Sequence, residues 1–160
     1  DLHKEYRRQR QMCIRDRAHT VYDGDRYILI VPYDGLRVTF TSVNNHPLLG
    51  IQQVDIDIDS DVFEREISPA RTIGFMSELK QLQAMGLAKG GNVDNVLVYD
   101  DTKCLSVPRF DDELVRHKIL DILGDLFLLG PIKGHIIALK SSHELNSRLA
   151  REILQEMKED

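Results

Sequence analysis

The stretch from residue 110 to residue 127 constrains the fold most, because it combines strong helix signals with polar groups inside an apolar pattern. Asp111 and Asp112 have side chains suited to capping its start, and Gly130-Pro131 beyond it cannot continue a helix. The apolar residues cover more than one helix face, so we expect the helix to be largely buried. They are Leu114, Val115, Ile119, Leu120, Ile122, Leu123, Leu126 and Phe127.

Three polar residues recur inside this helix. His117, Asp121 and Asp125 stand at i, i+4 and i+8, which places an imidazole and two carboxylates along one helix stripe. An imidazole and a carboxylate one turn apart can bind one divalent cation, and Asp125 would then orient a neighbouring group. A local hydrogen bond between His117 and Asp121 explains the same spacing. The spacing alone leaves both interpretations open.

The composition is typical of one soluble globular domain. The chain has 160 residues, of which 42% are hydrophobic and 29% charged, enough to bury one core. The net charge of -5 argues against nucleic acid as a partner. Cys13 and Cys104 do not have metal-binding spacing and are typical of a reducing cytoplasm. No apolar run is long enough to span a bilayer.

Residues 1–17 differ from the rest of the chain, because they are rich in Lys and Arg and lack apolar periodicity. We interpret this segment as an unrelated or disordered leader. A basic tail that binds RNA or anionic lipid is the alternative. We therefore predict that the fold occupies residues 18–160.

Strand patterns follow this leader. Residues 27–31 are rich in β-branched side chains, residues 36–41 alternate apolar and polar, and Asp34-Gly35 lies between them. This predicts a hairpin of these two strands. A last core strand is expected at residues 136–139, followed by a helix at residues 144–158 that His143 directly precedes.

The aspartates at positions 55, 57 and 59 match several positions of a calcium-binding EF-hand loop. Ser60 stands where such a loop needs glycine, and Val54, Ile56 and Ile58 alternate with the aspartates as in a strand. We therefore expect a strand with one face exposed to solvent.

His46 precedes a proline in a turn-forming segment and is interpreted as structural.

Residues 72–99 predict a small β-α-β insert with one apolar side. That side is suited either to the core or to a wall for a long-chain ligand. Together these patterns predict an α+β fold, a two-layer sandwich of an antiparallel-rich sheet and helices. The central helix at residues 110–127 and the C-terminal helix should cover one face of the sheet.

Several short motifs occur in one order along the chain. They are residues 67–72 (ISPART), 74–76 (GFM), 115–121 (VRHKILD), 124–126 (GDL) and 140–143 (KSSH). From about residue 23 to the C-terminal helix, the sequence resembles the zinc-dependent UDP-3-O-acyl-N-acetylglucosamine deacetylases of lipid A biosynthesis in Gram-negative bacteria. The resemblance implies a cytoplasmic hydrolase whose substrate is a UDP-linked acylated glucosamine.

The resemblance also implies roles for single residues in this chain. His117 and Asp121 match two of the family's three Zn²⁺ ligands. His143 matches its general acid, which Asp125 orients, and Thr72 matches a threonine that hydrogen-bonds the reacting centre.

Substrate contacts are implied in the same way. Lys118 would touch the anionic substrate, and the insert would line a passage for the acyl chain. The implied substrate-binding residues of the insert are Ile73, Phe75, Met76, Leu79, Ala88 and Val96.

The sequence departs from the family pattern in two respects. Ser142 and Ile73 stand where the family usually has glycine and phenylalanine. The third zinc ligand and the glutamate base of the family lie side by side in an earlier domain, and no glutamate in this chain directly precedes a histidine. We therefore predict that residues 18–160 are the second, C-terminal domain of the deacetylase, inactive without an N-terminal domain as partner. The competing interpretation is a noncatalytic binding domain with a structural, buried His-Asp network.

Overall fold

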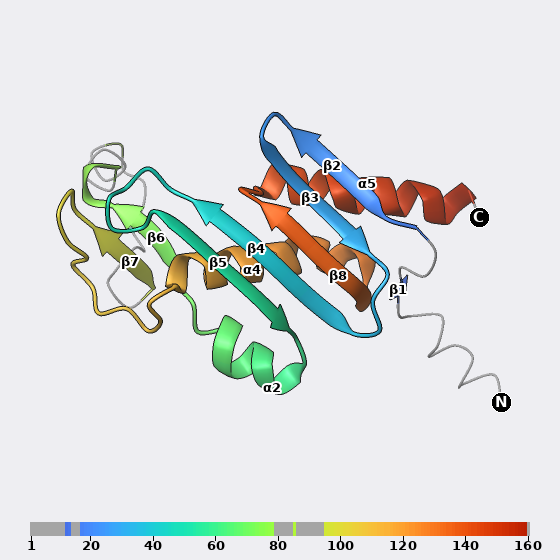
Figure 1. Cartoon of the computed structure of the whole chain (residues 1–160), viewed down its shortest axis with the longest axis horizontal. Helices are drawn as coiled ribbons and strands as arrows, with labels where there is room; N and C mark the ends of the chain where they lie inside the picture. Colours follow the sequence, from blue (N-terminus) through green and yellow to red (C-terminus); the bar gives the residue numbers. More distant parts are fainter. Residues whose placement is uncertain (1–11, 14–16, 79–84, 86–94, 160) are drawn as a thin grey trace.

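The computed structural model describes residues 12–13, 17–78, 85 and 95–159, which form a two-layer α+β domain. A sheet forms one layer, and α4 (Glu113–Leu126) and α5 (His143–Glu159) lie behind it in Figure 1. Both helices pack on the same face, α4 on the half of the sheet nearer the insert and α5 on the other half. The predicted fold class is therefore confirmed.

The main sheet is largely antiparallel. Its strand order is β2 (His19–Asp23), β3 (Arg26–Val31), β8 (Ile132–Leu139), β4 (Leu36–Val43) and β5 (Ile51–Asp57). Within this order only β8 and β4 are parallel, and β1 (Met12–Cys13) adds a short parallel pairing to β8. After β5, α2 (Ser60–Val62) continues as a wider helical turn, η1 (Phe63–Ile67).

β8 lies between β3 and β4, the two strands that we expected to pair as a hairpin. β3 forms its hairpin with β2 instead, and β8 pairs with β3 along one edge and with β4 along the other. The hairpin prediction was therefore wrong. An apolar strand such as β8 is stable at the centre of a sheet, where both of its edges are paired and one face is buried.

The helix-facing side of the sheet and the helices share one core. The central side chains are fully or almost fully buried: Ile28, Ile30, Val38, Phe40 and Ile136 from the sheet, Val115, Ile119, Ile122 and Leu126 from α4, and Leu145 and Leu149 from α5.

The other face of the sheet is polar. Arg37 donates two hydrogen bonds to the carboxylate of Asp55, at 2.9 and 2.5 Å. Hydrogen bonds from Arg37 and Thr39 lower the pKa of Asp55 to about 2. Residues 51–57 are thus a strand whose aspartates face solvent, and the calcium-loop interpretation is correctly rejected.

α4 is shorter and less uniformly buried than expected. It begins at Glu113 and ends at Leu126, and Phe127–Leu129 form a 3₁₀ turn. Asp112 occupies the N-cap position, but its side chain makes no cap hydrogen bond and accepts instead from Arg116 Nε at 2.5 Å. The prediction of an aspartate cap was wrong in this respect. Phe127 was expected to be buried and is 77% exposed, because the turn after α4 carries it out of the helix layer.

The insert contains a second, two-stranded parallel sheet, β6 (Thr72–Phe75) and β7 (Val96–Tyr99). Parallel strands need a crossover, as the predicted β-α-β unit has, although most of the expected helix lies outside the described residues. The ring of His46 stacks on Phe75, and its Nε2 donates to the Asp100 carbonyl oxygen at 2.9 Å. This histidine joins the β4–β5 loop to the insert, as expected of a structural residue.

Within the described part of the chain, no helix is long and apolar enough to cross a membrane.

Gly134→Ala is predicted to destabilise the domain, because β8 approaches β3 closely at this position. A Cβ at Gly134 would stand 2.8 Å from two side-chain carbons of Ile30, which is fully buried and has no room to move. We expect the free energy of unfolding to fall by about 1–3 kcal/mol in urea titrations.

Gly124→Ala is the matched control. A Cβ there meets nothing within 4 Å, so this helical glycine should gain about 0.5–1 kcal/mol on substitution. Equal stability of the wild type and Gly134→Ala would contradict the close approach of the two strands.

Candidate active site

His117 on α4 has one ring nitrogen held by the backbone and the other facing a carboxylate. Nδ1 donates to the carbonyl oxygen of Ala70 at 3.0 Å, and since a carbonyl only accepts, the proton lies on Nδ1. Nε2 lies 3.3 Å from Asp121 Oδ1. When His117 is neutral, its Nε2 and the Asp121 Oδ1 are both hydrogen-bond acceptors. A cation or a proton between them would therefore bind to both atoms. Histidine ligands of metals are held in this way through the other ring nitrogen.

Asp121 is the point where three predicted site residues converge. Lys118 Nζ donates to its Oδ2 at 3.2 Å, and His143 Nε2 lies 3.9 Å from the same oxygen. The Asp121 side chain is 16% exposed, so water reaches its carboxylate but screens the charge only in part. The i, i+4 spacing predicted the contact with His117, whereas the approach of His143 depends on the packing of α5 against α4.

His143 is oriented by a chain of hydrogen bonds at the start of α5. Its Nδ1 donates to Asp125 Oδ2 at 2.7 Å. The same oxygen accepts from Asn146 Nδ2 at 2.9 Å, and Asn146 Oδ1 accepts from Ser141 Oγ at 2.6 Å. The His143 side chain is 67% exposed, while Asn146 is buried. The arrangement fixes the ring through Nδ1 and turns Nε2 toward Asp121.

A pocket of about 440 Å³ adjoins His117 and brings together three of the seven predicted substrate residues, together with His117 and Thr72. Its lining includes His117, Lys118, Thr72, Ile73 and Phe75. These side chains come from the helix layer and from β6, so the insert forms one wall of the pocket.

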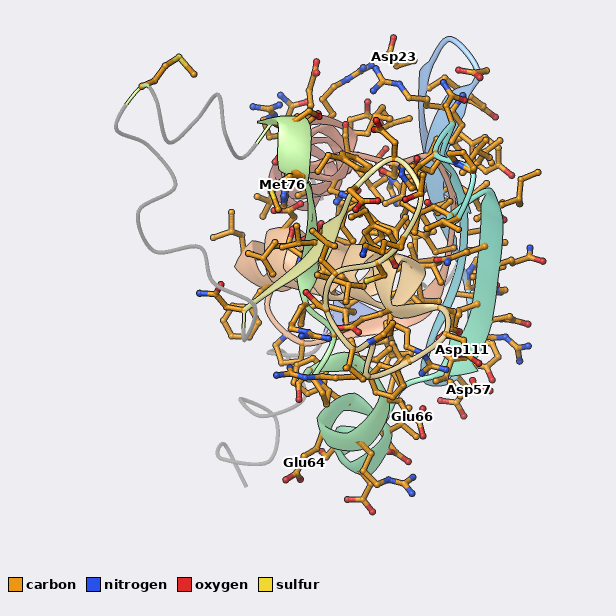
Figure 2. All side chains as sticks on the ribbon, turned by 90° about the vertical axis from the view of Figure 1, so that its left-hand side faces the viewer. Asp23, Asp57, Glu64, Glu66, Met76 and Asp111 are labelled. Carbon is orange, nitrogen blue, oxygen red and sulfur yellow. The ribbon has the colours of Figure 1, made fainter. Side chains whose placement is uncertain are left out.

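The remaining predicted substrate residues lie elsewhere. Met76, which is labelled in Figure 2, lines a neighbouring pocket of about 550 Å³ on the insert side of the molecule. His46 and Tyr99 line the same pocket. Val96 is half-buried on β7, where it pairs with Thr72. Leu79 and Ala88 lie outside the described residues.

Two cationic side chains that the sequence analysis did not single out also line the 440 Å³ pocket, Arg26 and Lys140. With Lys118 they give the pocket three basic residues, from β3, from α4 and from the turn after β8. Arg26 pairs with Asp23 and Lys140 with Asp25. Lys140 belongs to the 140–143 motif, which was a usable signal, but nothing local in the sequence connects Arg26 to the site.

A buried ion pair connects the start of β6 to the first turn of α4. Glu113 Oε1 accepts from Arg71 Nε at 2.8 Å and from the Arg71 backbone N–H at 3.0 Å, and its Oε2 accepts from the Arg109 N–H at 2.6 Å. The Glu113 side chain is fully buried and the Arg71 side chain is 8% exposed. Burial acts to raise the pKa of Glu113, but these hydrogen bonds outweigh it and hold the pKa below its ordinary value.

The donors present fit part of a zinc site. His117 and Asp121 offer an imidazole nitrogen and a carboxylate oxygen, both of which bind Zn²⁺ in proteins. Among the described residues, no group of three or more His, Cys, Asp or Glu side chains is placed to hold a metal ion. A tetrahedral site would need further ligands in addition to this pair.

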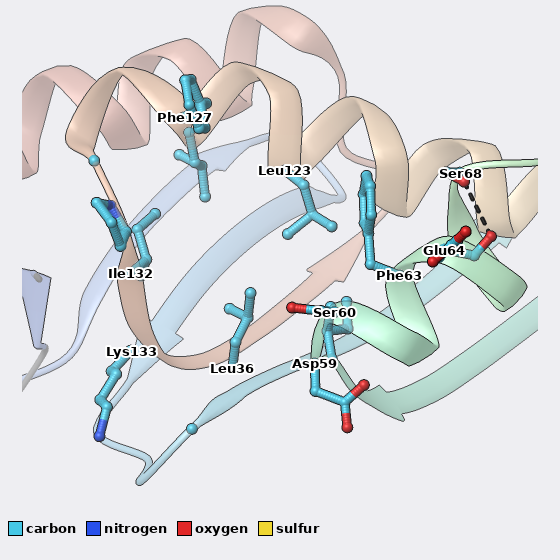
Figure 3. Close-up of a pocket in the computed structure, with 15 residues that line it drawn as sticks. Leu36, Asp59, Ser60, Phe63, Glu64, Ser68, Leu123, Phe127, Ile132 and Lys133 are labelled. Atoms are coloured by element: carbon cyan, nitrogen blue, oxygen red, sulfur yellow. Dashed lines mark hydrogen bonds between the residues drawn. The ribbon is translucent and has the colours of Figure 1, made fainter.

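A pocket larger than the two above lies at the other end of α4 and includes none of the predicted site residues. It measures about 780 Å³, and Figure 3 shows Leu123, Phe127 and Ile132 lining it on one side, with Phe63 and Ser60 on the other. Its polar lining residues are Asp59, Ser60, Glu64, Ser68 and Lys133, and it contains no histidine, so we locate the candidate site by the cluster around Asp121 rather than by pocket size.

Comparison with known proteins gives one family. The family model described as UDP-3-O-acyl N-acetylglycosamine deacetylase matches residues 2–155. The chain is 46% identical over 149 residues to the UDP-3-O-acyl-N-acetylglucosamine deacetylase of Hahella chejuensis, covering 88% of this chain and 48% of that protein. It is 45% identical over 139 residues to that of Leptospira biflexa, covering 86% and 46%.

A third similar protein is the deacetylase of the same name from Anaeromyxobacter sp. strain Fw109-5. It is 41% identical over 154 residues, which covers 94% of this chain and 51% of that protein. The chain spans about half the length of the curated relatives that it matches.

Glu113→Gln is predicted to destabilise the domain by about 3–5 kcal/mol at pH 7, because it removes the negative charge that compensates the buried Arg71 guanidinium. The pKa of Glu113 is lower in the folded than in the unfolded state, so its contribution is fully present above pH 4.5 and is lost as the pH falls through the folded pKa. Urea unfolding between pH 7 and pH 3 should show the difference between wild type and variant shrinking with acid. A difference that is independent of pH would contradict this account.

Proposed function

This chain belongs to the UDP-3-O-acyl-N-acetylglycosamine deacetylase family, and on that premise we propose that it is the C-terminal domain of a zinc-dependent deacetylase. The complete enzyme hydrolyses the N-acetyl group of UDP-3-O-acyl-N-acetylglucosamine in the cytoplasm of a Gram-negative bacterium, as a step of lipid A biosynthesis. The convergence of His117, His143 and Lys118 on the carboxylate of Asp121 carries this proposal.

His117 and Asp121 supply two of the Zn²⁺ ligands. In the neutral ring, the bond from Nδ1 to Ala70 places the proton on Nδ1 and leaves Nε2 as the nitrogen that can bind a metal. Lys118 draws one carboxylate oxygen of Asp121 to itself. A bound zinc ion supplies polarisation of the acetamide carbonyl and a water that loses its proton near neutral pH.

His143 acts as the general acid that protonates the departing amine. Its contact with Asp125 holds the ring in one orientation, from which Nε2 can deliver a proton to the amine. The exposure of its side chain supports this role, since a histidine buried for purely structural reasons does not reach a substrate. Thr72 lines the pocket beside His117, and in this proposal its hydroxyl group hydrogen-bonds the reacting centre.

The pocket chemistry suits both ends of the proposed substrate. Lys118, Arg26 and Lys140 offer positive charge to a diphosphate, and Ile73 and Phe75 offer an apolar wall. Met76, Val96 and, outside the described residues, Leu79 and Ala88 continue this apolar side as the passage for the acyl chain.

Residues 18–160 alone are proposed to be inactive. Two protein ligands bind zinc weakly, and the glutamate base that the family supplies from its N-terminal domain has no counterpart in this sequence. The partner of this domain is therefore the N-terminal half of the same enzyme. The alternative is a noncatalytic domain with a structural His-Asp network. Measuring the zinc content of the protein distinguishes this alternative from the proposed function.

Zinc content is the first test. Together with the N-terminal half of the Hahella chejuensis relative, the chain should bind about one zinc ion by elemental analysis and deacetylate the substrate. His117→Ala and Asp121→Ala should each lose the zinc and lower kcat/KM by more than about 100-fold, beyond the usual cost of losing a residue that only supports a ligand.

His135→Ala is the matched control, because His135 contacts Thr39 on the polar face of the sheet and should leave zinc and activity unchanged. If the wild-type assembly binds no metal and the two site variants lose only stability, the network is structural and the proposed function fails.

His143→Ala separates proton transfer from metal binding. We expect kcat to fall by about 10²–10⁴-fold, the usual contribution of a general acid, while the zinc content stays that of the wild type. Kinetics at saturating substrate combined with elemental analysis would measure both. Loss of zinc in this variant would instead make His143 a ligand.

A further inference from the structure

The Arg71–Glu113 pair is attached to the backbone next to the residue that holds His117. Three consecutive residues of this segment each make a fixed contact. The Pro69 carbonyl accepts from Arg109 Nη1 at 2.6 Å, the Ala70 carbonyl accepts from His117 Nδ1 at 3.0 Å, and the Arg71 N–H donates to Glu113 Oε1 at 3.0 Å. The Ala70 carbonyl therefore lies between two anchored positions and cannot rotate away without breaking one of them.

The helix side of this arrangement is equally rigid. Glu113 and His117 stand at i and i+4 on α4, so the carboxylate that anchors the segment and the imidazole that contacts it project from one helix face. Arg71 also reaches the Val107 carbonyl through Nη2 at 2.8 Å, which ties in the loop before α4. Thr72, the next residue, begins β6 and enters the pocket beside His117.

Stability alone does not account for a charged pair at this place. Removing two charges from water is costly, and well-packed apolar residues of similar volume commonly give equal or greater stability. The pair does fix the orientation of the Arg71 side chain relative to α4. Two hydrogen bonds join the planar guanidinium to the two carboxylate oxygens of Glu113, so neither group can rotate without breaking one of them.

We propose that Arg71 and Glu113 are positioning residues of the deacetylase site: they hold the Ala70 carbonyl where it takes the Nδ1 proton of His117, so that Nε2 remains free to bind the metal. The inference rests on the proposed function for its metal, but its first consequence, the protonation site of His117, exists without one. The same pair sets the position of Thr72 opposite His117.

The test measures the protonated nitrogen of His117 directly. Long-range ¹H–¹⁵N correlation NMR of the metal-free chain should show the proton of His117 on Nδ1. Glu113→Asp shortens the carboxylate and Arg71→Lys removes the planar fork, and in both a substantial fraction of His117 should carry the proton on Nε2. Zn²⁺ titration of the assembly with the N-terminal half should give a Kd about 10–100-fold weaker than that of the wild type.

Two further variants separate this effect from a loss of stability, one as a control and one as a second test. Arg116→Lys alters a comparable charged contact in the first half of α4, to Glu66 and Asp112, and should leave the His117 proton and the Kd for Zn²⁺ unchanged. Arg109→Ala changes an exposed side chain and removes the bond to the Pro69 carbonyl, the other anchor of the segment, so it tests whether anchoring of residues 69–71 sets the proton position even if the buried variants do not fold. It should also move part of the proton to Nε2.

Folded variants that keep the proton of His117 on Nδ1 and the wild-type Kd for Zn²⁺ would overturn the inference and leave the pair a structural one. Failure of the proposed function looks different. In that case the wild-type assembly binds no Zn²⁺ at all, while the NMR spectra still show whether the pair controls the protonation site of His117.

Discussion

The position of β8 between β3 and β4 is the constraint on which the rest of the domain depends. It makes one continuous sheet from two separate hairpins, β2–β3 and β4–β5, and so gives α4 and α5 a single surface to cover. It also determines where the chain goes next. β8 ends at Leu139, and Lys140 turns the backbone at a φ of 53°, so α5 begins beside α4 with His143 next to Asp125.

The polar residues of the site lie at the edge of the helix layer, where each is held by a neighbour. His117 is held by a backbone carbonyl, Asp121 by Lys118, and Asp125 by Asn146 and His143. These groups stay partly exposed, while the support behind them, Glu113 and Asn146, is buried. The domain thus places the polar groups of the candidate site on its two helices and places part of their support, the carboxylate of Glu113 and the amide of Asn146, in the interior.

Sequence patterns predicted the parts of this structure that depend on neighbours along the chain. The period of α4 and the alternation in β5 are local, and both were identified, as was the i, i+4 stripe of His117 and Asp121. The strand order was not, because the choice between a β3–β4 hairpin and the insertion of β8 depends on residues far along the chain. Nor was the contact between Arg71 and Glu113, which are 42 positions apart, or the Ala70 carbonyl, which no side-chain pattern reveals. The roles of the site residues came from the family resemblance and not from the spacing.

The central place of β8 also has a consequence for how the protein folds as it is synthesised. β3 and β4 leave the ribosome well before β8, and until β8 arrives each has an unpaired edge. During that interval the two strands can pair with each other, as their sequences suggest, and such a pairing must open before β8 enters. Closing the sheet around β8 requires pairing between strands that are far apart in the sequence, which is slow in general, and strand edges that wait unpaired are the kind of surface on which aggregation starts.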